Sequence, residues 1–185
     1  MKKQSISAIS ILLVLFTVFV SCKNEVANDA TQSEEYIISG NGFSVTFPDS
    51  VSMSIENVPT DAGNFKLTTY QSASSDNAVY TLTASVFPDS LVKKDKTAAL
   101  LENAKEQALI KCGMSTGIEE NKVDINGNPG IWFKTKKDMD TVVYYTEYKM
   151  YFVNNTLYQM GAMQRNAWPE KKRTDEFMNS FKLQN

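Results

Sequence analysis

The sequence predicts an α+β domain in which a mainly antiparallel sheet is covered by two helices. Segments with alternating apolar and polar residues form two blocks, and one stretch with helical spacing separates the blocks. A shorter amphipathic segment follows at residues 168–181. One long strand, Val142–Val153, is apolar on both faces, so we expect a helix on each side of the sheet. These observations together predict an α/β/α sandwich.

The first block contains five expected strands. Glycines at Gly40 and Gly42 separate the first two strands and predict a hairpin. A cluster of turn-forming residues at 72–77 separates the last two. The expected strands are Tyr36–Ile38, Phe43–Phe47, Val51–Ile55, Phe65–Gln71 and Val79–Phe87.

Helical spacing appears between Asp95 and Gly113, and Gly113 supplies a stop signal. The expected buried stripe of this helix consists of Ala98, Leu101, Ala104, Ala108 and Cys112. Its place on the stripe predicts that Cys112 is a small buried hydrophobic residue. The alternative is a reactive thiol whose pKa is lowered by the neighbouring Lys111.

Strand patterns return after this helix and are joined by tight turns at residues 126–130 and at Asn154-Asn155. The expected strands are Ile118–Ile125, Ile131–Lys136, Val142–Val153 and Thr156–Met163. The last segment predicts a short helix with Pro169 in its first turn. Its inward side chains are expected to be Phe177, Met178 and Phe181, and they cover the second face of the long strand.

The N-terminus predicts export. Two lysines precede the charge-free stretch Ala8–Val20, which is too short for a membrane span and ends at Ser21-Cys22. This arrangement resembles a bacterial lipobox, although Phe19 stands where Leu is usual. The resemblance implies a signal peptide at 1–21, cleavage between Ser21 and Cys22, and lipidation of Cys22 with diacylglycerol and an acyl chain such as palmitate. The alternative is an ordinary secretory signal with an incidental cysteine.

The remaining chain divides into a tether and one domain. Residues 22–35 begin with the expected lipidated Cys22 and continue as a polar, acidic stretch without periodicity, which is typical of a flexible linker. Residues 36–185 are long enough for a single domain with its own core.

Charge and composition exclude several classes of function. Without Lys2 and Lys3, the mature chain has 17 Lys and Arg against 21 Asp and Glu, a net charge of −4. This balance argues against nucleic acid as a partner, because such binding needs clustered cations. The chain has no histidine, which removes the commonest general base and metal ligand. Lipidation of Cys22 would leave Cys112 without a disulfide partner.

The order of these elements resembles the PsbP-like superfamily of α/β/α sandwich domains. The resemblance rests on the start Gly42–Pro48, the turn Ile125–Gly130, the hairpin Tyr151–Tyr158 and the terminal segment Phe177–Lys182. It covers residues 36–183 and implies the fold more firmly than a function. Members mostly act by binding proteins and share no catalytic residues that could be carried over to this chain.

Candidate catalytic groups are restricted to carboxylates. Asp138 and Asp140 are too few for a calcium loop, and Glu119 and Glu120 would point to opposite faces of a strand. Residues 113–117 match the Gly-x-Ser-x-Gly pattern, but the chain has no histidine that could activate Ser115. We therefore expect no catalytic residue, no metal site and no cofactor. Five tyrosines in the last two long strands are expected to pack in the core or, where exposed, to suit a protein-binding surface: Tyr144, Tyr145, Tyr148, Tyr151 and Tyr158.

Three positions match the Asp-Ser/Thr-aliphatic pattern of O-glycosylation in periplasmic proteins of Bacteroidota. They are Ser50, Ser90 and Thr141, each at an expected turn or strand edge.

From the sequence we expect a lipid-anchored, non-enzymatic binding or accessory module of the bacterial cell envelope that acts through protein contacts. The expected location is the outer membrane, at its periplasmic or surface face, with the lipid as the membrane contact. Two alternatives stay open: a carrier of a small apolar ligand and an enzyme that uses carboxylates alone.

Overall fold

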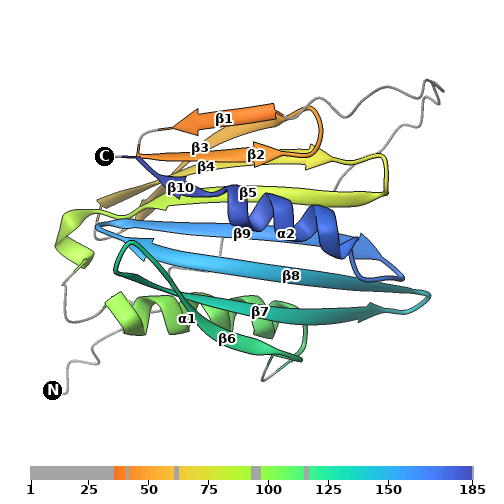
Figure 1. Cartoon of the computed structure of the whole chain (residues 1–185). Helices are drawn as coiled ribbons and strands as arrows, with labels where there is room; N and C mark the ends of the chain where they lie inside the picture. Colours follow the sequence, from red (N-terminus) through yellow and green to blue (C-terminus); the bar gives the residue numbers. More distant parts are fainter. Residues whose placement is uncertain (1–35, 41, 61–62, 93–96, 115–116, 185) are drawn as a thin grey trace, which may run out of the picture. The chain divides into compact units, whose positions relative to one another are not determined.

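A computed structural model describes residues 36–184 apart from 41, 61–62, 93–96 and 115–116 (Figure 1). The expected signal peptide, Cys22 and the tether lie outside the described residues. The described part contains ten strands and two α-helices. In chain order they are β1 (Tyr36–Gly40), β2 (Phe43–Phe47), β3 (Ser52–Thr60), β4 (Gly63–Ala73), β5 (Ala78–Val86), α1 (Thr97–Lys111), β6 (Glu120–Ile125), β7 (Asn128–Met139), β8 (Val142–Val153), β9 (Thr156–Arg165), α2 (Lys171–Ser180) and β10 (Lys182–Leu183), with a short 3₁₀ helix η2 (Asp89–Leu91) after β5.

The strands form two antiparallel sheets. Seven strands make a large sheet in the order β3-β4-β5-β9-β8-β7-β6, and three make a small sheet in the order β1-β2-β10. The predicted β1–β2 hairpin is therefore present but belongs to the small sheet. β10 was not expected from the sequence, and it pairs with β2 through Lys182 opposite Ser44 and Leu183 opposite Phe43.

Helix α2 and the small sheet lie on one face of the large sheet, which we call the α2 face (Figure 1). Phe47 of β2 packs against Phe177 of α2 with ring centroids 5.0 Å apart, and Phe177 also meets Tyr80 of β5 at 5.3 Å. Phe181, directly after α2, stacks on Tyr151 of β8 at 5.9 Å. These rings belong to one buried core cluster, so the predicted inward role of Phe177, Met178 and Phe181 is confirmed.

Helix α1 lies over β7 and β8 on the opposite face, which we call the α1 face. Phe133 and Thr135 of β7 are fully buried there, and Phe133 stacks on Tyr148 of β8 at 5.0 Å. Strand β8 is thus covered on both faces along part of its length, as the apolar pattern of Val142–Val153 predicts.

One close approach in the large sheet requires a glycine. A Cβ placed on Gly130 of β7 would lie 2.4 Å from the ring of Tyr151 and 2.6 Å from the carbonyl oxygen of Met150. Only the absence of a side chain at Gly130 lets Tyr151 pack across β7.

Two details of α1 differ from the sequence-based expectation. The buried residues are Leu101, Ala104 and Leu109, whereas Ala98 is exposed. Apolar residues occur all around this helix, so their spacing does not mark one face. Cys112 lies one residue beyond the helix and is half-buried, with its Sγ 3.5 Å from Thr135 Oγ1. Cys112 is therefore only partly buried, whereas the sequence predicted a buried residue.

The start of α2 also differs. The N-cap is Glu170 and the first helical residue is Lys171, so Pro169 precedes the helix and does not lie in its first turn. Within the described residues, neither helix is long and apolar enough to cross a bilayer.

Candidate functional site

A group of aromatic and charged side chains occupies the part of the α2 face that lies beyond helix α2. Trp132 and Lys134 come from β7, Tyr145 and Glu147 from β8, and Trp168 from the β9–α2 connection. We call these five residues the aromatic face. Alternation along each strand puts Trp132 and Lys134 on one side of β7, and the register places Lys134 directly opposite Glu147. The aromatic face contains both tryptophans of the chain.

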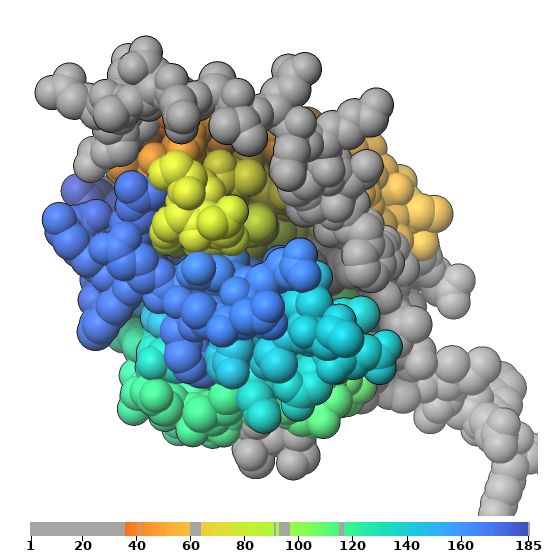
Figure 2. Space-filling view, turned by 90° about the vertical axis from the view of Figure 1, so that its right-hand side faces the viewer, coloured from red at the N-terminus to blue at the C-terminus, as the bar shows by residue number. Residues whose placement is uncertain are grey.

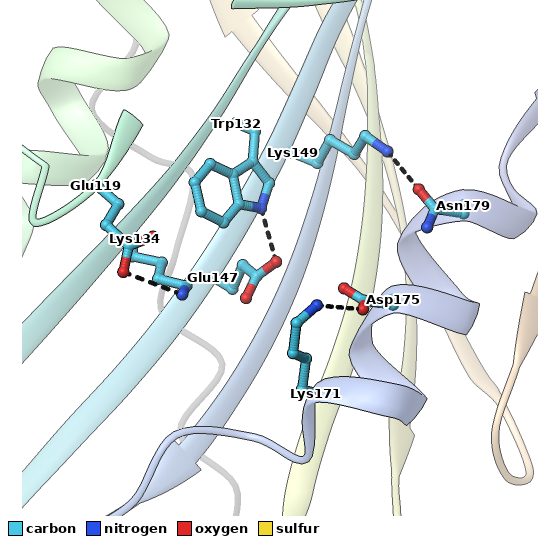
Figure 3. A network of polar contacts seen from close by, with 8 residues as sticks. All are labelled: Glu119, Trp132, Lys134, Glu147, Lys149, Lys171, Asp175 and Asn179. Carbon is cyan, nitrogen blue, oxygen red and sulfur yellow. Dashed lines mark hydrogen bonds and ion pairs between the residues drawn. The ribbon is translucent and has the colours of Figure 1, made fainter. Parts of the chain in front are cut away.

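Lys134 joins the two tryptophans. Its Nζ lies 5.3 Å from the centroid of the Trp132 ring and 5.3 Å from that of Trp168. The same ammonium lies 3.3 Å from Glu119 Oε1, just before β6 (Figure 3). Cation–π contacts at partly exposed sites contribute about 0.5–1 kcal/mol each. Lys134 therefore fixes the positions of two indoles that are distant in sequence.

Further contacts orient the rings. The Trp132 Nε1–H donates a hydrogen bond of 2.6 Å to Glu147 Oε1 (Figure 3). Tyr145 packs against Trp168 with centroids 4.9 Å apart and ring planes inclined by 58°. Trp168 remains 38% exposed, and Trp132 and Tyr145 are half-buried. The aromatic face is thus ordered by its own contacts while its rings still reach solvent.

Helix α2 borders the aromatic face with polar groups. Lys149 of β8 donates a hydrogen bond from Nζ to Asn179 Oδ1 at 2.9 Å (Figure 3). The same Nζ donates to the Met178 carbonyl oxygen at 3.3 Å. Burial lowers the pKa of Lys149, and the nearby Glu147 and Asp175 oppose that shift. Lys171 forms an ion pair with Asp175 one helical turn later. Lys149 therefore holds the C-terminal end of α2 against the sheet.

The connections around this region are held together by backbone and side-chain bonds. Asn166 N–H donates to the Val143 carbonyl oxygen at 2.6 Å, and Val143 N–H donates to Asn166 Oδ1 at 3.0 Å. Arg173 of α2 reaches Ser74 Oγ at 2.7 Å in the β4–β5 turn. Figure 2 looks onto this end of the domain, where the β7–β8 hairpin (cyan), the β9–α2 connection (blue) and the β4–β5 turn (yellow) lie side by side. These bonds anchor the segment that carries Trp168.

The four carboxylates considered from the sequence form ion pairs or lie in a turn, and they do not come together in one site. Glu119 pairs with Lys134 on the α2 face, whereas Glu120 pairs with Lys105 of α1 at 3.5 Å. The prediction that these two acids diverge is confirmed. Asp138 pairs with Lys136 at 3.6 Å, and Asp140 adopts a left-handed turn conformation with φ of 51°. Over the described part of the chain, no group of three or more His, Cys, Asp or Glu side chains could hold a metal ion.

The other expected sites lie apart from the aromatic face or outside the described residues. Ser21 and Cys22 belong to the part that is not described. Ser50 follows β2, Ser90 lies in η2, and Thr141 is in the β7–β8 turn. All three hydroxyl-bearing residues are exposed, so each is accessible to a modifying enzyme.

Sequence reasoning pointed to the tyrosines and missed the tryptophans. Tyr151 and Tyr158 are buried in the core, and Tyr145 belongs to the aromatic face. The signal that could have been used is the i, i+2 spacing of Trp132 with Lys134 and of Tyr145 with Glu147 on successive strands. Recognising it requires the register of β7 with β8, which the sequence does not specify.

Comparisons with known proteins support the fold alone. The sequence matches no protein-family model and no curated protein. The solution structure of cyanobacterial PsbP (CyanoP) from Synechocystis sp. PCC 6803 is similar with a TM-score of 0.54 at 9% identity, covering 86% of this chain and 98% of that chain. A crystal structure from Bacteroides thetaiotaomicron VPI-5482 gives a TM-score of 0.48 at 12% identity, and the match covers 84% of this chain and 50% of that one. The described domain is therefore an α+β sandwich with a PsbP-like fold.

Proposed function

We propose that this chain is a lipid-anchored, non-enzymatic binding module of the bacterial cell envelope and that it acts through protein contacts at the aromatic face. The observation that carries the proposal is the exposure of Trp168 beside the half-buried Trp132 and Tyr145. Tryptophan and tyrosine dominate the energetic centres of protein interfaces, and charged residues form the surrounding rim. Lys134, Glu147 and Glu119 supply such a rim here.

The order of the aromatic face supports this role. Association costs less when interface side chains are already held in their bound conformations. The bond between Trp132 and Glu147 and the contacts of Lys134 restrict both indoles before any partner arrives. A flexible surface would lose more conformational entropy on binding.

The membrane anchor rests on Ser21-Cys22 after the apolar stretch. Acyl chains contribute about 0.8 kcal/mol per buried CH₂, so two or three chains hold a protein stably at a bilayer. Cys22→Ser should release the protein from membranes or block its processing, as measured by fractionation and mass spectrometry. A Cys22→Ser protein that is cleaved normally and stays membrane-bound would contradict the anchor.

Protein contact at the aromatic face can be tested in living cells with a photo-crosslinking amino acid. We expect a discrete adduct from position 168 and none from position 110, because Ile110 is 63% exposed but lies on α1, on the opposite side of the sheet. Lys134→Glu should abolish the adduct from position 168, since it removes the cation that contacts Trp132 and puts a third carboxylate beside Glu119 and Glu147 in the middle of the proposed surface. Equal adducts from positions 168 and 110, or none from either, would refute the proposed surface.

A further inference from the structure

Strand β3 is an edge strand of the large sheet. It comes first in the strand order, and within the described residues only β4 pairs with it, along Ser52–Thr60. Among the described residues, the backbone N–H and C=O groups on the outer side of β3 have no strand partner, and such groups can pair with another strand. The opposite edge, β6, is shorter, with six residues.

The edge has few of the features that usually prevent such pairing. Natural edge strands carry lysines, prolines or bulges, whereas Ser52–Val58 contains Glu56 as its one charged residue, and Pro59 comes only near the end of the strand. Met53 is 58% exposed and Ile55 is 51% exposed. Both lie on the α2 face, because Met53 is opposite Tyr70, whose ring meets Phe43 of β2.

We propose that β3 pairs antiparallel with β3 of a second copy of this chain, around a two-fold axis at Ser54. This register places Met53 opposite Ile55 of the second copy and Ile55 opposite its Met53, so all four exposed apolar side chains meet on one face. It also places Glu56 opposite Ser52 of the second copy. The pairing joins the two large sheets into one continuous sheet.

Other registers are less favourable. An axis at Glu56 would set two carboxylates directly opposite each other, which destabilises a strand pair. An axis at Ile55 would put Met53 opposite the polar Asn57. The axis at Ser54 pairs the apolar Met53 with Ile55 and also keeps the two Glu56 carboxylates apart.

The geometry of the pairing also suits a shared membrane. A two-fold axis between side-by-side antiparallel strands is perpendicular to the sheet, so the α2 faces of both copies point in the same direction. Strand β1, where the described chain begins, belongs to the small sheet on that face. Residues 23–35 span at most about 45 Å when extended. Both tethers can therefore reach one bilayer, a point that rests on the proposed Cys22 anchor, whereas the strand pairing itself does not.

Disulfide trapping in the full chain, expressed in its native envelope, tests the register. Directly opposed residues of antiparallel strands have Cα atoms about 4.5–5.5 Å apart, within the range of about 4.4–6.8 Å that a disulfide needs. In a Cys112→Ser background, Ser54→Cys should shift to a covalent dimer on mild oxidation with diamide. Ser52→Cys is the matched control on the same strand, because its two copies would lie about 14 Å apart. Ser52→Cys and Glu56→Cys expressed together should again give a dimer.

A second variant checks that the apolar contacts hold the pair. Ile55→Lys added to Ser54→Cys should abolish the dimer while leaving the melting temperature of the reduced, dilute single copy unchanged, since Ile55 is exposed there. The proposal is overturned if Ser54→Cys stays monomeric, links to a different protein, crosslinks no better than Ser52→Cys, or still dimerises with Ile55→Lys. A disulfide-linked dimer of the Cys112→Ser parent, which lacks the Ser54→Cys change, would show that Cys22 has a free thiol. That result would count against lipidation of Cys22 but not against the pairing of β3. The series would then be repeated with Cys22→Ser.

Discussion

The α2 face of the large sheet has two halves that use aromatic side chains in different ways. In the first half, rings from the small sheet, β5 and α2 pack on one another, and Phe47, Tyr80 and Phe177 are at most 2% exposed. In the second half, Trp132, Tyr145 and Trp168 pack on one another and on charged groups, and remain partly exposed.

The difference comes from what lies above the sheet. The layer formed by the small sheet and α2 covers β5, β9 and part of β8, and the rings beneath it become core. Where that layer ends, the same types of residue have no apolar cover and are surrounded by Lys134, Glu147 and Lys149. Aromatic residues on this face thus stabilise the fold in one half and are available for contact in the other.

Removal of α2 and β10 should have the largest effect on folding. A chain ending at residue 167 lacks α2, Phe181 and β10, which leaves Tyr80, Tyr151 and Phe47 without their partners. The domain should unfold or aggregate, as measured by circular dichroism and light scattering. A soluble, monomeric and cooperatively folded truncation would show that the sandwich does not depend on α2.

Phe177→Ala should be strongly destabilising. The side chain is 2% exposed and contacts both Phe47 and Tyr80. Truncation of a buried Phe costs about 3–5 kcal/mol, out of about 5–15 kcal/mol for a whole domain. Lys172→Ala is the control on the exposed side of α2, where substitutions change stability by about 0.5 kcal/mol or less. Equal urea midpoints for the two variants would contradict the assignment of Phe177 to the core.

Alkaline pH should lower the melting temperature through Tyr80 in the buried half, by less than Phe177→Ala does. Burial, reinforced by Asp76, raises the pKa of Tyr80 to about 12. Because the folded-state pKa lies above the ordinary value of about 10, the protonated phenol favours the folded state, and this contribution is lost as the pH rises from about 10 towards 12. The melting temperature of the native chain should therefore fall more steeply over this interval than that of Tyr80→Phe. Parallel pH profiles would argue against a buried phenol.

Trp168→Ala should have the smallest effect on stability. It removes one contact with Lys134 and one with Tyr145 from a partly exposed site, so the free energy of unfolding should change by about 1 kcal/mol or less. The same urea titration used for Phe177→Ala measures the change. A loss comparable to that of Phe177→Ala would make the aromatic face part of the core.

Local signals in the sequence predicted much of the fold. Asn126, Gly127 and Asn154 have positive φ angles in the turns where the sequence placed reversals, and Val142–Val153 has the bounds of β8. The two-residue strand β10 could not be predicted, because only its pairing with β2 defines it. The separation into two sheets likewise depends on contacts between distant segments.

The candidate site was less accessible to sequence reasoning. Trp132, Lys134 and Trp168 come together only through the register of β7 with β8 and the path of the β9–α2 connection. Cys112 was misplaced because the apolar residues of α1 do not mark one face. Lipidation of Cys22 and glycosylation of Ser50, Ser90 and Thr141 stay predictions, since they depend on enzymes that act on the chain.

Hydroxyl-radical footprinting of the protein in its native envelope and after purification tests the central claim most directly. Trp168 is 38% exposed, and Met139, on the other side of β7, is 43% exposed and serves as the internal reference. If a protein partner covers the aromatic face, oxidation of Trp168 relative to Met139 should be much slower in the envelope than in the purified protein. An unchanged ratio would show that the aromatic face is free in the cell and would contradict its role in protein contact.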